Sequence, residues 1–87
     1  MVAYEIRFTS RAERDFLHLP RQIQVRFVPA LRQLAEDPFR ARVGVDVKKL
    51  GGGEGERRLR VGGYRLLYRV VEDVVEVFEV GPRGNFY

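Results

Sequence analysis

The residues of this chain with the clearest chemical potential are arginines near its C-terminal end. Between Arg57 and Arg69 there are five arginines and no acidic residue, although the whole chain of 87 residues has a net charge of only +4. The positive charge is therefore local, and tyrosines lie within it. A guanidinium group binds phosphate through paired hydrogen bonds and stacks on bases, so this pattern favours RNA as a ligand. The arginines concerned are Arg57, Arg58, Arg60, Arg65 and Arg69.

Composition limits what other chemistry the chain can perform. It has no cysteine and a single histidine, His18, so we expect no disulfide framework, no metal site and no cofactor. A length of 87 residues predicts one domain, residues 1–87. Charged residues enter at Glu5, and no stretch approaches the roughly 20 apolar residues of a membrane span. We therefore expect a soluble, cytoplasmic protein without a membrane partner.

The N-terminal part predicts a strand followed by two helices. Apolar and polar residues alternate over residues 2–9, which is typical of a strand with one buried face. Ser10 and Glu13 have the spacing of a capping box, so a helix is predicted to begin there. A second helix, antiparallel to the first, is predicted over residues 21–36, with a kink or break near Pro29 because proline lacks the backbone donor that a helix needs.

The C-terminal part predicts an antiparallel meander of three strands. Residues 39–55 contain many strand and helix breakers and are interpreted as a flexible loop. The strands are predicted over residues 56–61, 64–71 and 74–80, joined by tight turns at Gly62-Gly63 and Glu72-Asp73. The predicted fold is α+β, with an N-terminal strand, a helical hairpin and this meander, and with the helices packed on one face of the sheet.

Alternation along the strands predicts where the side chains point. Arg58 and Arg60 alternate with Leu59, so both arginines should lie on the face away from the core. Arg65 and Arg83 are expected to be exposed arginines that can be replaced at little cost to the fold. Register is not readable from sequence, so whether Arg65 shares the face of Arg58 and Arg60 is left open. Three other side chains are expected to have no role in the site. Tyr64 and Tyr68 are predicted to pack in the core, and His18 is predicted to lie on the surface of a helix.

The order of elements and three short motifs resemble the RelE/ParE superfamily of toxins from toxin–antitoxin systems. The motifs are Val47-Lys48-Lys49-Leu50, the run from Arg58 to Tyr68 that begins Arg-Leu-Arg-Val-Gly-Gly-Tyr-Arg, and Val80-Gly81-Pro82-Arg83 followed by Tyr87. The resemblance covers nearly the whole chain. It implies the α+β fold predicted above and a cognate antitoxin as partner, in a complex that contains a monomeric toxin.

The superfamily is divided by activity. RelE-type members cut mRNA in the decoding site of the ribosome, whereas ParE-type members inhibit DNA gyrase and generally lack the catalytic set. By motif, the RelE-type set corresponds to Arg58, Arg60, Arg65, Arg83 and Tyr87 in this chain. The resemblance thus implies a metal-independent endoribonuclease whose partners are the ribosome and mRNA. In the implied reaction a ribose 2′-hydroxyl attacks the adjacent phosphate, and the 5′-oxygen leaves.

The roles within this set are constrained by arginine chemistry. Relatives often have lysine where this chain has Arg58 and Arg60, and a guanidinium with a pKa above about 12 is a poor proton acceptor or donor. The four arginines are therefore assigned to electrostatic stabilisation, and Tyr87 to stacking or orientation of the nucleophile. The proton acceptor would be ribosomal RNA, the substrate or an unusually placed arginine. Lys48, Lys49, Arg57 and Arg69 are predicted to bind RNA.

Two other functions remain open at this point. One is a ParE-type inhibitor of gyrase, in which the arginines perform no chemistry. The other is an inactive, RNA-binding member of the same fold, which the arginines at positions 58 and 60 keep open.

Overall fold

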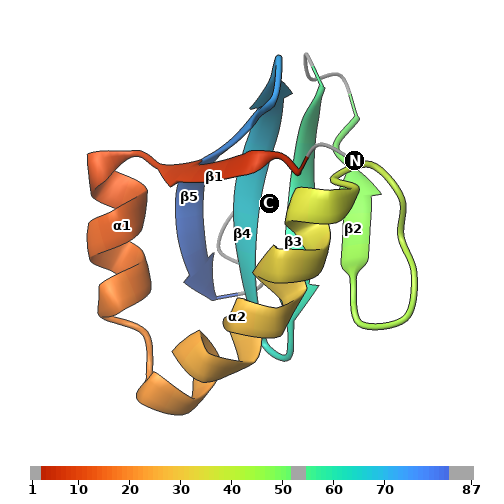
Figure 1. Cartoon of the computed structure of the whole chain (residues 1–87). Coiled ribbons are helices and arrows are strands. Elements are labelled where there is room, and N and C mark those ends of the chain that lie inside the picture. Colours follow the sequence, from red (N-terminus) through yellow and green to blue (C-terminus); the bar gives the residue numbers. More distant parts are fainter. Residues whose placement is uncertain (1–2, 52–54, 83–87) are drawn as a thin grey trace.

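Two helices pack on one face of a five-stranded sheet in the computed structural model, which describes residues 3–51 and 55–82 (Figure 1). The elements are β1 (Glu5–Phe8), α1 (Ser10–Leu17), α2 (Arg21–Glu36), β2 (Asp46–Lys49), β3 (Glu56–Val61), β4 (Tyr64–Val71) and β5 (Val74–Pro82). The strand order is β1-β5-β4-β3-β2, with β1 parallel to β5 and the other neighbours antiparallel. The predicted α+β architecture is confirmed. No helix in the described residues is long and apolar enough to cross a membrane.

The meander of β3, β4 and β5 forms as the sequence predicts. Its two connections are two-residue turns, which match the right-handed twist of the strands when the backbone takes positive φ. Gly62 has φ +60° and Glu72 has φ +55°. The register of β4 with β5 shifts at a bulge between Leu67 and Tyr68. The turns and the bulge therefore fix which side chains of the three strands share a face.

Residues 39–55 are not entirely the loop that their composition predicts. They contain β2, an edge strand of four residues that pairs with β3, so that Asp46 lies opposite Arg60 and Lys48 opposite Arg58. Val45 and Val47 alternate with polar neighbours and are buried, and this burial holds the short strand in place. A strand of this length between glycines is too short to show a clear period in the sequence.

The helices form where the sequence predicts them and differ from the prediction in two local features. Helix α1 begins at Ser10 and is capped by Thr9, whose Oγ1 accepts a hydrogen bond from the Ala12 N–H at 3.2 Å. The prediction of Ser10 as the N-terminal cap is therefore wrong by one residue, because Thr9 is the cap. Helix α2 keeps its predicted bounds and is continuous through Pro29, so the predicted break does not occur.

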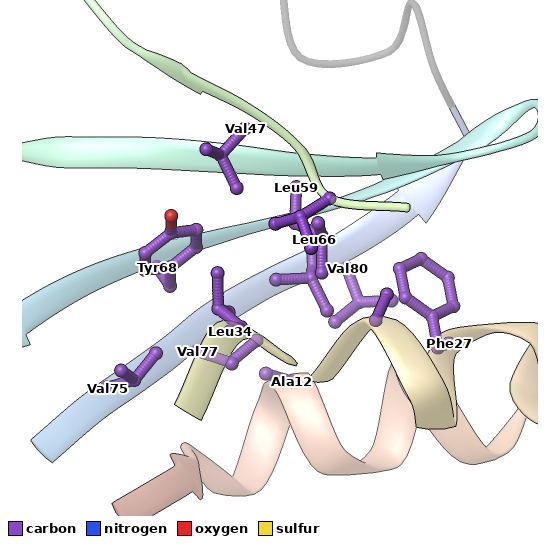
Figure 2. Packing of buried hydrophobic residues seen from close by; sticks show 12 residues of the cluster. Ala12, Phe27, Leu34, Val47, Leu59, Leu66, Tyr68, Val75, Val77 and Val80 are labelled. Carbon is purple, nitrogen blue, oxygen red and sulfur yellow. The ribbon is translucent and has the colours of Figure 1, made fainter. Parts of the chain in front are cut away.

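The core lies between the helices and the sheet, as Figure 2 shows. Leu59, Leu66 and Val77 from the sheet have no exposed surface, and neither do Phe27 and Leu34 of α2. The two helices meet where Phe16 of α1 contacts Phe27, with ring centroids 5.8 Å apart and the rings edge to face. This apolar layer lies on the face of the sheet that the two helices cover.

Tyr68 is a core residue whose hydroxyl makes a buried hydrogen bond, and the contribution of this bond to stability can be measured. The side chain is fully buried, its hydroxyl donates a hydrogen bond of 2.6 Å to the Pro38 carbonyl, and burial raises its pKa to about 12. We expect Tyr68→Phe to lower the free energy of unfolding by about 1–2 kcal/mol, because the Pro38 carbonyl loses its buried donor. Urea unfolding near neutral pH measures this. Tyr64→Phe, at a half-buried tyrosine, is the matched control, and equal losses for the two variants would contradict the prediction.

Candidate nucleic-acid interface

The face of the sheet away from the helices gathers most of the basic residues that the sequence singles out. Side chains directly opposite each other in an antiparallel pair lie on the same face, and side chains two apart on one strand do too. Arg60 is opposite Arg65, and Lys48 is opposite Arg58. The set Lys48, Arg58, Arg60, Arg65 and Arg69, here called the arginine face, therefore lies on the side away from the helices. The register answers the question that the sequence leaves open, since Arg65 shares the face of Arg58 and Arg60.

Arg65 differs from the expectation of an exposed and replaceable arginine. It is 1% exposed, on the strand β4, with Arg60 on one neighbouring strand and Gly81 on the other. The alternation of polar and apolar residues along β4 does not reveal this burial. The expectation of free exposure is wrong for this residue, and its side chain is part of the packed structure.

An acidic residue that the sequence does not single out joins the arginine face. Asp46 of β2 contacts Arg60 Nε through Oδ2 at 2.9 Å and Arg58 Nη1 through Oδ1 at 3.4 Å. The Asp46 side chain is 46% exposed, compared with 13% for Arg58 and 35% for Arg60. The carboxylate is thus held by two cations and still reaches solvent. In the sequence, the apolar residues Val45 and Val47 on either side of Asp46 indicate that Asp46 lies on a strand.

The far end of the arginine face is electrostatically different. Arg69 lies 3.6 Å from Glu56 Oε2 and 3.7 Å from Glu76 Oε1, and its guanidinium stacks on the Phe78 ring at 4.3 Å. Two carboxylates therefore offset its charge, whereas Arg58 and Arg60 share one. The surplus of positive charge lies at the Arg58–Arg60 end.

Several predicted residues are not brought to this face. Arg57 points to the other side of β3, where it is opposite Tyr68 and stacks on Phe39 at 5.0 Å. Lys49 is opposite Arg57 and so shares that side. Arg83 and Tyr87, predicted to be catalytic, lie outside the described residues. His18 is exposed at the end of α1, with Nδ1 2.7 Å from the Arg14 carbonyl oxygen.

The geometry provides two kinds of chemistry next to each other. Arginine N–H groups can stabilise the charge of a phosphate undergoing substitution, because they form charge-assisted hydrogen bonds to its oxygens. A carboxylate can accept a proton, which arginine does poorly. Asp46 adds the group that the arginine set lacks.

Comparison with known proteins places the chain in a family. The family of ParE toxins of type II toxin–antitoxin systems matches residues 6–87. Toxin RelG of Mycobacterium tuberculosis is 36% identical, over 97% of this chain and 95% of RelG. The isolated Escherichia coli RelE toxin has a TM-score of 0.80 at 28% identity, over 95% of this chain and 87% of RelE. RelE of the archaeal RelE–RelB complex from Pyrococcus horikoshii has a TM-score of 0.78 at 28% identity, over 95% and 98% of the two chains. The resemblance drawn from the motifs is thereby confirmed, and this chain belongs to the RelE/ParE superfamily of type II toxin–antitoxin toxins.

Proposed function

We propose that this toxin is a ribosome-dependent endoribonuclease that cuts mRNA in the decoding site and thereby inhibits translation. One observation supports this most strongly: Arg58, Arg60 and Arg65 share one face of the sheet with a carboxylate, Asp46, beside two of them. Similarity to RelE-named toxins over nearly the whole chain agrees with this assignment. The chain would act in the cytoplasm, where ribosomes are.

The reaction is an internal transfer that needs no external nucleophile. The ribose 2′-hydroxyl oxygen forms a bond to the adjacent phosphorus, the 2′-proton moves to a base, and the bond from phosphorus to the 5′-oxygen breaks. A cyclic phosphate and a free 5′-hydroxyl result, with water supplying the proton to the leaving oxygen. Arg60 binds Asp46 through Nε, and its two terminal nitrogens make no hydrogen bond with any described residue. Those nitrogens are placed to bind the phosphate as its charge increases.

Asp46 is the proton acceptor in this proposal. Guanidinium groups have no acceptor atom to offer, so Arg58 and Arg60 are poorly suited to remove the 2′-proton. The carboxylate is half exposed at the same end of the face, and contacts to the two guanidinium groups fix its direction. The same arginines would therefore orient the base and stabilise the phosphorane. The ribosome supplies the alignment of the mRNA, which explains why free RNA should be a poor substrate.

A cognate antitoxin is the second expected partner. The archaeal RelE in the comparison was crystallised in a complex with RelB. We propose that this toxin, as a monomer, likewise forms a complex with an antitoxin, and that acidic residues of the antitoxin neutralise the arginine face.

Inhibition of gyrase is the alternative function, and the family description favours it because it names ParE toxins. In that case the arginines would contact protein, and Asp46 would have no proton to accept. A third possibility, an inactive RNA-binding protein, would keep RNA affinity without cleavage. Direct observation of the cut ends of an mRNA separates all three.

The test is mapping of 5′ ends on a defined mRNA incubated with the purified toxin, with and without ribosomes stalled on it. We expect cuts in the decoding site that need the ribosome. Arg60→Ala should reduce the cleavage rate by about 10- to 100-fold, because one charge-assisted contact to the transition state is lost. Arg32→Ala, an exposed arginine on α2, is the matched control and should cut like the wild type. Intact mRNA in every reaction with folded toxin would instead favour gyrase inhibition or lost activity.

A further inference from the structure

A groove of about 480 Å³ lies between α2, the segment 42–46 and the end of β3. Helix α2 contributes Arg26 and Gln33 to its walls, the segment contributes Arg42, and β3 contributes Arg60. Arg60 also belongs to the arginine face. The groove and that face are therefore continuous around the end of β3, and a ligand that lies on one can extend into the other.

Positive charge dominates the walls of the groove. Three arginines line it, and the one carboxylate among the lining residues, Asp46, is shared between Arg58 and Arg60. Arg26 is exposed and makes no hydrogen bond or ion pair with any residue in the described part of the chain. A charge in that position is available for an anionic ligand.

Arg42 supplies a second cation, which makes no ion pair with a carboxylate of residues 3–51 and 55–82, although its charge helps to lower the pKa of the nearby Asp37. Its guanidinium donates hydrogen bonds to the Asp37 carbonyl at 3.0 Å, the Arg40 carbonyl at 2.6 Å and the Gln33 carbonyl. These contacts satisfy carbonyls at the end of α2 and hold the side chain in place. Because all three acceptors are neutral, its charge still acts on the groove.

Glycine at position 62 makes room for Arg26 at the groove. Gly62 has φ +60°, and a Cβ atom there would lie 3.0 Å from Arg26 Nη1. Any other residue would have to strain the turn and displace the guanidinium. The β3–β4 turn and α2 therefore fit together around this arginine.

The bottom of the groove is apolar and made of small side chains. Ala30 is 5% exposed and Val45 is fully buried, with Val61 beside them in the lining. Pro29 lies on the same wall, although proline inside a helix is normally strongly disfavoured. Breaks of a local rule in native proteins are common at functional sites. A small apolar floor under arginines suits a ribose or base with its phosphate on the guanidinium groups.

We propose that this groove binds a nucleotide of the RNA strand adjacent to the one on the arginine face, with a phosphate on Arg26. The inference rests on the proposed function, since it extends the RNA path beyond the site of cleavage. RNA is favoured over an acidic protein segment because Arg60 joins the groove to the proposed cleavage site. Planar guanidinium groups also match phosphate oxygens in pairs.

The experiment measures binding of a short, labelled 2′-O-methyl oligoribonucleotide by fluorescence anisotropy over a range of salt concentrations. The probe has no 2′-hydroxyl to attack, so binding is separated from cleavage. We expect Arg26→Ala to weaken binding several-fold and to reduce the slope of log affinity against log salt by about 0.7, the value for one contact to a single-strand phosphate. Arg32→Ala removes the same charge from the same helix outside the groove, and should leave the slope unchanged. Arg26→Lys should keep most of the slope.

Each other outcome has a defined meaning. If Arg26→Ala and Arg32→Ala reduced RNA affinity by the same small amount, the groove would not be an RNA site. Ribosome-dependent cleavage by the wild type would still support the proposed function in that case. If Arg26→Ala lost antitoxin binding and kept its RNA affinity, the groove would instead be a site for an acidic segment of the antitoxin, and the RNA proposal would be overturned. Circular dichroism of each variant confirms that the compared proteins are folded.

Discussion

Replacing Arg65 with alanine is expected to lower the free energy of unfolding by about 3 kcal/mol, as for other large buried side chains cut back to alanine. Arg65 is 1% exposed on the central strand β4, so the change removes packed atoms and leaves a cavity. A domain of this size has a total stability of about 5–10 kcal/mol. The variant should therefore unfold at a much lower urea concentration and accumulate poorly in cells.

The matched comparison is Arg60→Ala, on the same face and directly opposite Arg65. Its side chain is 35% exposed and its ion pair with Asp46 is accessible to water, so the expected loss is within about 1 kcal/mol. Urea unfolding followed by circular dichroism measures both variants. An Arg65→Ala protein as stable as Arg60→Ala would show that the buried guanidinium contributes little to the fold.

This difference determines how loss of toxicity can be interpreted. An inactive Arg65→Ala toxin would report a damaged fold as readily as a missing catalytic group. Arg60→Ala changes the chemistry at the surface and leaves the core intact. The test of function therefore relies on Arg60.

The sequence predicts those parts of the fold that depend on local patterns. Alternation over β3 to β5 and the two-residue turns at Gly62 and Glu72 fix the meander, because neighbours in sequence become neighbours in the sheet. The spacing of Phe27, Ala30 and Leu34 predicts α2 in the same way. Its continuity through Pro29 is a tertiary effect, since packing of that apolar side outweighs the lost backbone hydrogen bond.

The candidate site is less predictable because it depends on register between distant segments. Arg58 and Arg60 could be assigned to one face from their own strand, but their partner Asp46 comes from β2, which pairs with β3 across the segment interpreted as a loop. The near-complete burial of Arg65 likewise follows from no pattern in its own strand. A one-residue slip in the pairing of β2 with β3 would move Asp46 to the other face. Local patterns thus identify the residue types, and long-range pairing decides which of them meet.

Asp46→Asn is expected to have the largest effect on catalysis, because it removes the proposed proton acceptor and keeps its size. Loss of a general base reduces cleavage of ribosome-bound mRNA by about 10²- to 10⁴-fold. RNA affinity should rise at the same time, since Arg58 and Arg60 lose the carboxylate that offsets their charge. Single-turnover cleavage and binding of a 2′-O-methyl oligoribonucleotide measure the two effects separately.

The size of the loss in Asp46→Asn distinguishes a proton acceptor from a residue that only positions the arginines. The amide keeps the size of the carboxylate and an oxygen that accepts hydrogen bonds from Arg58 and Arg60, but it cannot take up the 2′-proton. A positioning role therefore predicts a small loss of cleavage in Asp46→Asn, whereas the role of proton acceptor predicts the large one. Asp46→Glu should restore part of the rate, and Asp73→Asn, an exposed acid in the β4–β5 turn, should cut like the wild type. Asp46→Asn that cleaves at the wild-type rate would return the role of base to the ribosome or the RNA, with the arginines alone as the toxin's contribution to the transition state.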